Sequence, residues 1–417
     1  MDTKTVASGA LHRPRLEDEP LVRGLGRFAA DVAMSGQAYA YFVRSPHAFA
    51  DIRSIDTDAA RAATGVLAVL TAADMEGIGN VSQHPPLAGR GGSKLVVPKR
   101  PALAGATVRH VGEPVAMVVA QTLTAAQDAA ELVAIDYEER TPVVDLREAV
   151  REDASQVWTE APGNIAVDWP GLATNPEANA EEIERVIASA KHVARVSVVH
   201  QRIMVASMEP RGATASYDPA SESYFLRCCS QSARALRDGL APILGVPNQR
   251  LRVLTEDVGG AFGLKTGPYP EYLAVLVAAR KLGRPVHWMS SRAEAFLSDN
   301  HARDAYSDVE LALDERRKFL ALRIRHLGNM GAYIGAVGAN IQTVNLARCL
   351  PGMYDIPRID IGVRCVFTNT TPTAPYRGAG RPEANYMLER VVEEAARVIG
   401  IDPIKLRRRN LIKPSAI

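Results

Sequence analysis

The sequence predicts an α+β protein in two parts: a small mixed α+β domain, then a larger domain of mixed sheets and helices. Three observations support this. The chain has 417 residues, which is too long for one ordinary hydrophobic core. Its first third carries short runs of Val, Ala and Leu between Gly, Pro and charged residues, which is typical of strands. Its later part carries longer strand-like runs that alternate with amphipathic helical segments.

Composition excludes some classes of partner. Apolar residues make up 47% of the chain and charged residues 23%, as in globular proteins. The net charge of +2 gives no field of the kind that nucleic-acid-binding proteins use, so no nucleic-acid partner is expected. No uncharged apolar run reaches about 18 residues, so no membrane span is expected. The N-terminus lacks the apolar core of a secretory signal, and we expect a cytoplasmic protein.

The cysteines do not indicate metal or redox chemistry. They are Cys228, Cys229, Cys349 and Cys365, and they form no CxxC pair and have no histidine at zinc spacing. We interpret them as reduced thiols of the core. No protein-bound metal ion is therefore predicted.

The first domain is expected to span residues 15–150. Its strands are expected at 37–45, 65–71 and 113–120. An Ala-rich helix running into a short strand is expected at 124–138, and a long Gly- and Pro-rich surface loop at 76–107.

The linker is expected at 151–180, because the stretch APGNIAVDWPGLATNPEANA is rich in Pro, Gly and Asn. The larger domain then covers 181–417, with extended, β-branched segments at 192–207 and 319–329. Its last helix should bury one stripe, formed by Met387, Val391, Ala395 and Val398.

The larger domain repeats one arrangement three times: a strand runs into a short loop and then into the start of a helix. The three segments are 223–245, 251–283 and 359–400. Pro270 and Pro382 stand at first-turn positions of the second and third helices, where a missing amide hydrogen costs nothing. Each junction presents unpaired amides and the positive end of a helix dipole. Converging junctions would suit an extended anion, although ordinary strand–helix turns would carry the same pattern.

The loop EDVGGAFGLKTG at 256–267 is glycine-rich yet fails both nucleotide-binding patterns. A P-loop has glycine before its lysine, whereas Leu264 precedes Lys265 here. The glycine spacing also fails the Rossmann fingerprint, which excludes an NAD-dependent Rossmann enzyme. The glycines still allow backbone amides to approach a ligand closely.

Taken together, VGGAFGLK, the SQ pair at 230–231 and PYRGAGRPE at 375–383 resemble the molybdenum hydroxylase family. That family includes xanthine dehydrogenases, aldehyde oxidases and the large subunits of aerobic carbon monoxide dehydrogenases. LVRGLGRFAADV, AYAYFVRSPHA and VRHVGEPVAMVVA resemble its N-terminal a/b hammerhead domain. The resemblance covers nearly the whole chain. It implies a hammerhead domain at 15–150 and the first molybdopterin-binding domain at 181–417, with the second absent from this chain.

The resemblance also assigns roles to residues. Gln231 matches the glutamine whose amide donates to a molybdenum oxo ligand, and Arg377 matches the loop beside the metal; these two are the catalytic candidates. The metal is held by the pterin dithiolene, not by protein ligands. The implied cofactor-binding residues are Gln231, Gly259, Gly260, Ala261, Phe262, Gly263, Arg377 and Gly378. The implied substrate pocket includes Thr266, Gly378 and Ala379.

Each of these residues has an ordinary alternative when it is considered alone. Gln231 would be a hydrogen bonder at a helix end. Phe262 would be a core aromatic, Arg377 a solvated arginine and Lys265 a surface lysine. Only the joint match of the three loops favours the cofactor interpretation.

The loops differ from the family pattern in two ways that affect which substrate is expected. Family members that oxidise CO at a copper–molybdenum centre have a copper-binding cysteine where this chain has Gly378, which offers copper no ligand atom. CO oxidation is therefore disfavoured, although that family label would readily be applied to the chain. Purine-oxidising members have a phenylalanine at the position of Ala379 and a glutamate at that of Thr266. An aldehyde or a different N-heterocycle is the better expectation.

The third departure is length. Family large subunits are roughly twice as long, and their catalytic glutamate lies in the C-terminal half. Glu271 and Glu383 lie near the loops, but as first-turn acids they are explained by the helix dipole. The chain is either truncated or one half of a split subunit. We expect it to be inactive without the other half and, with apolar surface uncovered, poorly soluble or associated.

The implied function is therefore the N-terminal portion of a hydroxylase large subunit in a heteromeric complex. The implied cofactor is molybdopterin cytosine dinucleotide. An FAD-binding medium subunit and a 2Fe–2S small subunit would accept the electrons, because this chain has no cluster-binding cysteine pattern. A separate C-terminal half of the large subunit would be a further partner. The alternative is a non-catalytic cofactor-binding or assembly protein that lacks the base.

Overall fold

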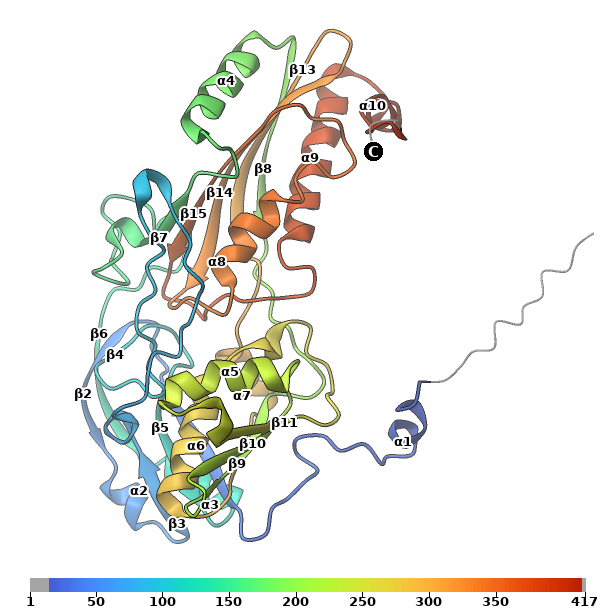
Figure 1. Cartoon of the computed structure of the whole chain (residues 1–417). Helices are drawn as coiled ribbons and strands as arrows, with labels where there is room; N and C mark the ends of the chain where they lie inside the picture. The colour runs from blue at the N-terminus through green and yellow to red at the C-terminus, as the bar shows by residue number, and fades with distance from the viewer. Residues whose placement is uncertain (1–14, 415–417) are drawn as a thin grey trace, which may run out of the picture.

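The computed structural model describes residues 15–414, and in this part of the chain the predicted α+β class is confirmed. Two lobes stand one above the other, each built on its own large sheet, with a small third sheet beside the lower lobe (Figure 1). The predicted strands at 37–45, 65–71 and 113–120 are confirmed as β1 (Ala38–Arg44), β3 (Val66–Leu70) and β5 (Pro114–Ala120).

The lower lobe is organised by a seven-stranded sheet in the order β11-β10-β9-β12-β1-β5-β3. Its remaining strands are β9 (Gly212–Asp218), β10 (Ser223–Cys228), β11 (Leu251–Leu254) and β12 (Val286–Met289). Strands from both predicted domains thus share one sheet: β1 pairs in parallel with β12, with Ala38 opposite Val286. The sequence boundary near 150 does not separate two independent cores.

Strand β5 shows why this sheet holds the lobe together. All seven of its residues are buried, as expected for a strand covered on both faces. Met117 and Val119 enter the core shared with helix α6 (Pro270–Leu282), whereas Val118 and Ala120 pack toward helix α3 (Leu123–Ala130). The near-continuous apolar run in the sequence is therefore divided between two cores by the period-two alternation of a strand.

The small third sheet has the order β4-β2-β6 and completes the N-terminal unit. Its strands are β2 (Ala50–Asp56), β4 (Thr107–Val108) and β6 (Ala134–Glu139), and helix α2 spans Asp58–Ala62. The predicted helix running into a short strand is confirmed by α3 and β6. The Gly- and Pro-rich loop is confirmed as irregular, with one 3-10 turn at Arg90–Gly92 and one isolated bridge between Ala88 and Lys94 before β4 begins. Its expected surface position is wrong at residues 102–104, which are buried.

The upper lobe is built on a five-stranded sheet in the order β7-β15-β14-β13-β8. Its strands are β7 (Ile165–Trp169), β8 (His192–His200), β13 (Ala305–Leu313), β14 (Phe319–Gly331) and β15 (Ile359–Phe367). Strand β7 lies inside the segment 151–180 that was expected to be a linker, and Trp169 pairs with Val363 of β15. Helix α4 (Pro176–Ser189) also begins there. The linker prediction is wrong in this respect, because a short apolar run among turn residues forms an edge strand.

Helix α9 (Arg381–Ile399) packs on β8 and β13 along the concave side of the upper lobe (Figure 1). Met387, Val391 and Ala395 are buried as predicted, but Val398 is half exposed. Leu388, Val392 and Ala396 are also buried, so the buried face is wider than the predicted stripe. The predicted stripe is thus wrong at its last position, where the helix end leaves the sheet.

The other helices are α1 (Asp18–Val22), α5 (Ala233–Leu244), α7 (Arg292–Ser298), α8 (Gly338–Asn340) and α10 (Pro403–Arg409). In the part of the chain from 15 to 414, no helix is long and apolar enough to cross a bilayer. Residues 415–417 of the predicted larger domain, and residues 1–14 of the N-terminus searched for a signal, lie outside the described residues.

Candidate functional site

The three predicted strand–loop–helix junctions meet in one place. They connect β10 to α5, β11 to α6 and β15 to α9. The backbone amide of Gln231 in the first loop donates to the carbonyl of Lys265 in the second, at 3.0 Å. A Cβ on Gly263 of the second loop would lie 2.6 Å from the carbonyl oxygen of Pro375 in the third. The three loops are therefore in direct contact.

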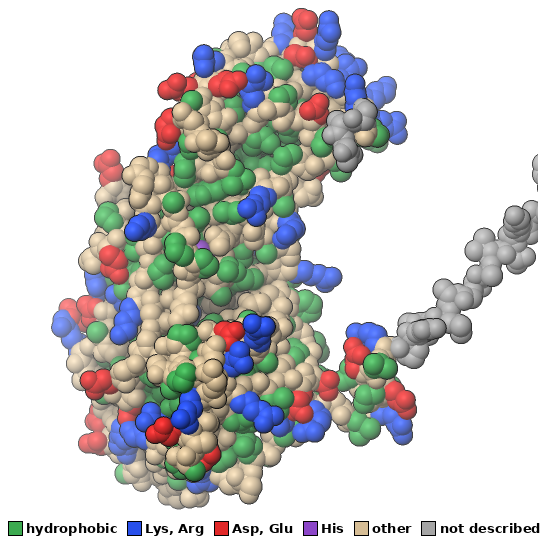
Figure 2. All heavy atoms as spheres, viewed as in Figure 1, with side chains coloured by type: hydrophobic (Ala, Val, Ile, Leu, Met, Phe, Trp, Pro, Cys, Tyr) green, Lys and Arg blue, Asp and Glu red, His purple; other side chains and the backbone are tan. Residues whose placement is uncertain are grey.

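The space-filling view places these loops in context. Figure 2 shows the molecule hollowed between the two lobes, with apolar and uncharged atoms lining much of the hollow and several basic side chains at its margin. The helices that follow the loops, α5 and α6 below and α9 above, lie on either side of this gap (Figure 1). The hollow is thus flanked by both lobes.

Gln231 is exposed, and its side chain has a defined orientation. Its Oε1 accepts the amide hydrogen of Gly263 at 2.8 Å. Because a backbone amide can only donate, the carbonyl oxygen must face Gly263 and the NH₂ group faces away. Among residues 15–414 no hydrogen-bond acceptor takes the Nε2 hydrogens. Gln231 therefore presents two side-chain donors to a ligand.

The glycine loop presents backbone donors beside Gln231. Gly260, Phe262 and Gly263 have φ values of 94°, 52° and 106°, so the chain turns repeatedly through the left-handed region. The amides of Gly260, Ala261 and Phe262 have no hydrogen-bond acceptor within the described part of the chain. Successive free amides in such a turn form a concavity that binds anionic oxygen.

Phe262 is not a core aromatic. Its side chain is 44% exposed, and its positive φ is a strained conformation for a residue with a Cβ. The core alternative considered for Phe262 is therefore wrong. Strain of this kind persists only where the surroundings impose it, and it is common at ligand-binding loops.

The third loop repeats the left-handed geometry. Gly378, Ala379 and Gly380 have φ values of 96°, 45° and 93°. The carbonyl of exposed Arg377 accepts a hydrogen bond of 2.8 Å from Arg303. A Cβ on Gly378 would lie 2.6 Å from the Pro382 ring, so this position has no room for a side chain without movement.

Thr266 lies under the glycine loop, in a short 3-10 turn at Leu264–Thr266. Its half-buried hydroxyl donates to the carbonyl of Gly263 at 2.9 Å. The threonine thus supports the conformation of the loop.

Three charged residues near the loops have partners that the sequence did not indicate. The Lys265 side chain is fully buried and pairs with Glu209 at 3.1 Å, so its interpretation as a surface lysine is wrong. Glu271 and Glu383 do lie in helix first turns, but both are buried. Glu383 pairs with Arg303 at 2.8 Å. The helix dipole alone does not account for these acids.

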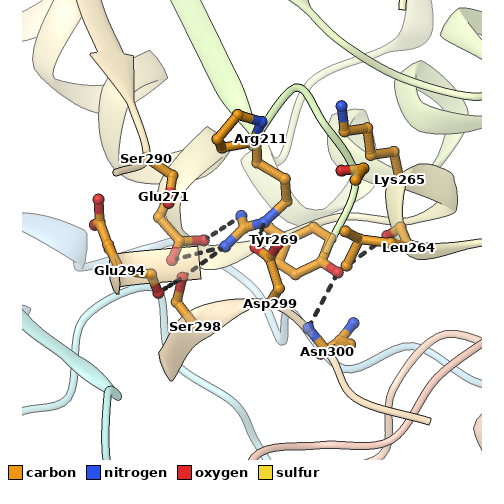
Figure 3. Close-up of polar contacts among 12 residues, drawn as sticks. Arg211, Leu264, Lys265, Tyr269, Glu271, Ser290, Glu294, Ser298, Asp299 and Asn300 are labelled. Atoms are coloured by element: carbon orange, nitrogen blue, oxygen red, sulfur yellow. Dashed lines mark hydrogen bonds and ion pairs between the residues drawn. The ribbon is translucent and has the colours of Figure 1, made fainter. Parts of the chain in front are cut away.

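Glu271 belongs to a buried ionic network behind the second loop (Figure 3). Fully buried Arg211 donates to Glu271 at 2.9 Å and to Asp299 at 2.5 Å. Burial alone would raise the pKa of Glu271, but the charges of Arg211 and Arg44 outweigh it and hold that pKa well below its usual range. Glu271 therefore stays ionised in the folded chain, which suits support of a site rather than proton transfer.

The cysteines are free, as predicted, and Cys228, Cys229 and Cys365 are buried. Burial raises the pKa of all three thiols. Among residues 15–414 no three His, Cys, Asp or Glu side chains gather as a candidate site for a metal ion.

The geometry defines a class of site: strand–helix loops present free backbone amides and a side-chain NH₂ group, donors that suit an oxygen-rich anionic group. Family comparison makes the class specific. Residues 160–411 match the molybdopterin cofactor-binding domain, and residues 23–141 match the a/b hammerhead domain of aldehyde oxidase and xanthine dehydrogenase. The chain belongs to the molybdenum hydroxylase family.

Individual relatives agree. The chain is 33% identical over 402 residues to the 6-hydroxypseudooxynicotine dehydrogenase complex subunit gamma of Paenarthrobacter nicotinovorans, covering 95% of this chain and 49% of that one. It is 33% identical to the carbon monoxide dehydrogenase large chain of Afipia carboxidovorans, covering 96% and 50%. The crystal structure of quinoline 2-oxidoreductase from Pseudomonas putida 86 superposes with a TM-score of 0.89 at 32% identity, covering 97% and 50%.

The chain therefore spans about half the length of these relatives. It spans a larger share of one further relative. The nicotinate dehydrogenase large molybdopterin subunit of Eubacterium barkeri is 25% identical, and the match covers 93% of this chain and 85% of that subunit.

Proposed function

We propose that the chain is the N-terminal portion of the molybdopterin-binding large subunit of a hydroxylase that oxidises an aldehyde or an N-heterocycle, with water as the source of oxygen. One observation carries the proposal: the three loops that match the family motifs are in direct contact. There the free amides of residues 260–262 and the NH₂ group of Gln231 lie together.

These donors fit the implied cofactor, molybdopterin cytosine dinucleotide. Gln231 and the amides of the glycine loop would hold its oxygen atoms, and Arg377 and Gly378 would lie beside them in the third loop. When bound, the cofactor supplies the redox-active metal centre for the hydroxylation. Loops without side chains at Gly260, Gly263 and Gly378 let the backbone approach such a group closely.

The substrate class rests on three positions. Gly378 offers no thiolate for copper and has no space for a side chain, which argues against CO as substrate. Ala379 provides no aromatic wall, and the hydroxyl of Thr266 is engaged by the Gly263 carbonyl. A purine would thus find no aromatic wall at Ala379 and no acid at Thr266.

The chain's own acids do not supply a general base. Glu271 and Glu383 are both buried and paired with arginines, so neither is positioned to take a proton from a ligand. We infer that the base lies in the part of the relatives' length that this chain does not span.

Exposed apolar side chains support a partner chain that would cover them. Met208 is 89% exposed, and Phe296 and Leu297 are also exposed. Surface of this kind marks an interface. Electrons would leave to an FAD-binding medium subunit and a 2Fe–2S small subunit, as in a cytoplasmic heteromeric hydroxylase.

The test is elemental analysis for molybdenum, with identification of the released nucleotide, on protein purified from its own host with its co-purifying chains. We expect near-stoichiometric molybdenum, a cytosine nucleotide and a second polypeptide. Absence of all three from a well-behaved chain purified alone would overturn the hydroxylase proposal. Cofactor on the chain without any partner would instead favour the alternative, a non-catalytic carrier or assembly protein.

A further inference from the structure

A buried ion pair lies directly behind the glycine loop. The Nζ atom of Lys265 is 3.1 Å from the Oε2 atom of Glu209 and donates to the Glu209 carbonyl at 2.8 Å. The Lys265 side chain is fully buried, and Glu209 is nearly so. A buried charge of this kind requires a partner, since an isolated ammonium would be strongly destabilising.

Glu209 is bonded to the loop at two further points. Its Oε2 atom also accepts the amide hydrogen of Gly259 at 2.8 Å, and its own amide donates to the Gly259 carbonyl at 2.9 Å. A Cβ on Gly259 would lie 2.5 Å from the Glu209 Cβ, so the two backbones touch. The Oε1 atom of Glu209 accepts a hydrogen bond from the amide of Ala29, so Glu209 also contacts the N-terminal segment.

Lys265 connects the same unit to the first loop. Its carbonyl accepts the amide hydrogen of Gln231 at 3.0 Å. The side chain of Lys265 therefore fixes one end of the glycine loop to Glu209, while its backbone fixes Gln231. One residue pair thus sets the position of both groups of ligand donors.

The pair is itself anchored in the core. Glu209 lies two residues before Arg211, whose guanidinium stacks at 3.7 Å on Tyr269 and pairs with Glu271 and Asp299. Tyr269 donates its hydroxyl to the Leu264 carbonyl at 3.0 Å, next to Lys265 (Figure 3). The glycine loop therefore contacts the Arg211 network at two places, through Glu209 and through Tyr269.

Stability alone is a poor reason for such a pair, because well-packed apolar residues of similar size often stabilise as much or more. We propose that Glu209 and Lys265 are positioning residues that hold the amides of residues 259–263 and the Gln231 side chain in register toward the bound cofactor. This inference rests on the proposed function for the identity of the ligand. The geometry that it describes exists in the free chain.

The experiment measures amide hydrogen exchange over 258–265, and molybdenum and nucleotide content, in the complex as purified. The variants are K265M, E209Q and E209D; the last keeps both charges but withdraws the carboxylate by one methylene from Gly259. The control is K281M, which removes a half-exposed lysine paired with Asp74. We expect exchange at least tenfold faster at the hydrogen-bonded amides of Gly259, Gly263 and Leu264 in all three variants, and molybdenum content reduced severalfold, with K281M unchanged.

The outcomes separate the two proposals. Unchanged exchange in a folded E209D or K265M would overturn the positioning role, whatever the metal content. Faster exchange with no molybdenum in any sample, wild type included, would support the positioning role and overturn the proposed cofactor. Faster exchange with wild-type molybdenum content would show that loop register does not govern cofactor retention, and would overturn the inference.

Discussion

Gly263 combines two requirements at a single residue. Its amide donates to Gln231, and its lack of a side chain lets the second loop touch Pro375 of the third. Its φ of 106° is also a conformation that residues with a Cβ rarely adopt. The relative position of two loops therefore depends on one glycine.

We expect Gly263→Ala to separate the second and third loops and to reduce molybdenum content severalfold, with a loss of stability of about 1–3 kcal/mol. Metal analysis and urea unfolding would measure the two effects. Gly283→Ala is the matched control, since Gly283 also has a positive φ of 61° but open space around its Cβ position. If both variants lost the same amount of cofactor, the loss would come from backbone strain at a positive φ, and the role of the contact between the two loops would be contradicted.

Glu271 is a second residue whose removal should be costly. It accepts from both Arg211 and Arg44 in the core, so Glu271→Gln would leave buried positive charge undercompensated. We expect a loss of about 3–5 kcal/mol in the free energy of unfolding. Glu177→Gln, which breaks an exposed pair with Arg90, should change it by less than about 1 kcal/mol. Similar urea midpoints for the two variants would contradict the role of the network.

The positions of the loops could be predicted from the sequence, but the buried ion pairs behind them could not. Glycines after strand-like runs and before helices indicated where amides would be exposed, and the structure brings those loops together. Lys265, in contrast, pairs with Glu209, 56 residues earlier, and Arg211 pairs with Asp299, 88 residues later. Sequence patterns report neighbours along an element, not partners between elements. For this reason the sequence alone did not distinguish the buried Lys265 from a surface lysine.

At the scale of elements, a polar chain crosses three strands of the upper sheet. Gln342 Oε1 accepts from His326 Nε2 at 2.9 Å, and in the neutral imidazole His326 Nδ1 then accepts from the Ser307 hydroxyl at 2.7 Å. That hydroxyl oxygen in turn accepts from His200 Nε2 at 3.2 Å. Both imidazoles are neutral in this arrangement. Burial lowers the pKa of His326 to about 4 and that of His200 to about 3.

These histidines should make the upper lobe sensitive to acid. The unfolded chain binds a proton on each near pH 6.5, whereas the folded chain does so only near pH 3–4. The stabilisation that comes from keeping these histidines neutral is fully present above about pH 6.5. As the pH falls from there toward the folded pKa, the free energy of unfolding decreases by about 1.4 kcal/mol per pH unit for each histidine. Unfolding free energies measured between pH 7 and 5 should fall less steeply for His326→Gln than for the wild type. Parallel curves would contradict this assignment.

Strand β7 shows the limit of prediction for elements. Its five residues lie between Gly and Pro, in a segment whose composition is that of a connection. It becomes a strand only because β15, far along the chain, offers an edge to pair with. The longer segments that became β8, β14 and α9 were predictable, because their own apolar periodicity is sufficient to define them.

At the scale of the whole molecule, two sequence units make one folding unit. The N-terminal unit gives β1, β5 and β3 to the seven-stranded sheet, and the later part of the chain gives the other four strands. Ala38, Phe42 and Met117 share a core with Tyr272 and Leu276 of α6. The hammerhead unit therefore has one face that only the rest of the chain can cover.

A fragment of residues 15–150 should consequently fail to fold on its own. Without β12 the edge of β1 is unpaired, and without α6 the apolar face of β1 and β5 is open to water, so the fragment should associate through both. Gel filtration and thermal unfolding would measure this, with residues 151–417 co-expressed as the matched sample. We expect a cooperative transition only when both pieces are present. A monomeric fragment with its own cooperative transition would mean that β1, β5 and β3 need no more than the small sheet and α3 to close their core.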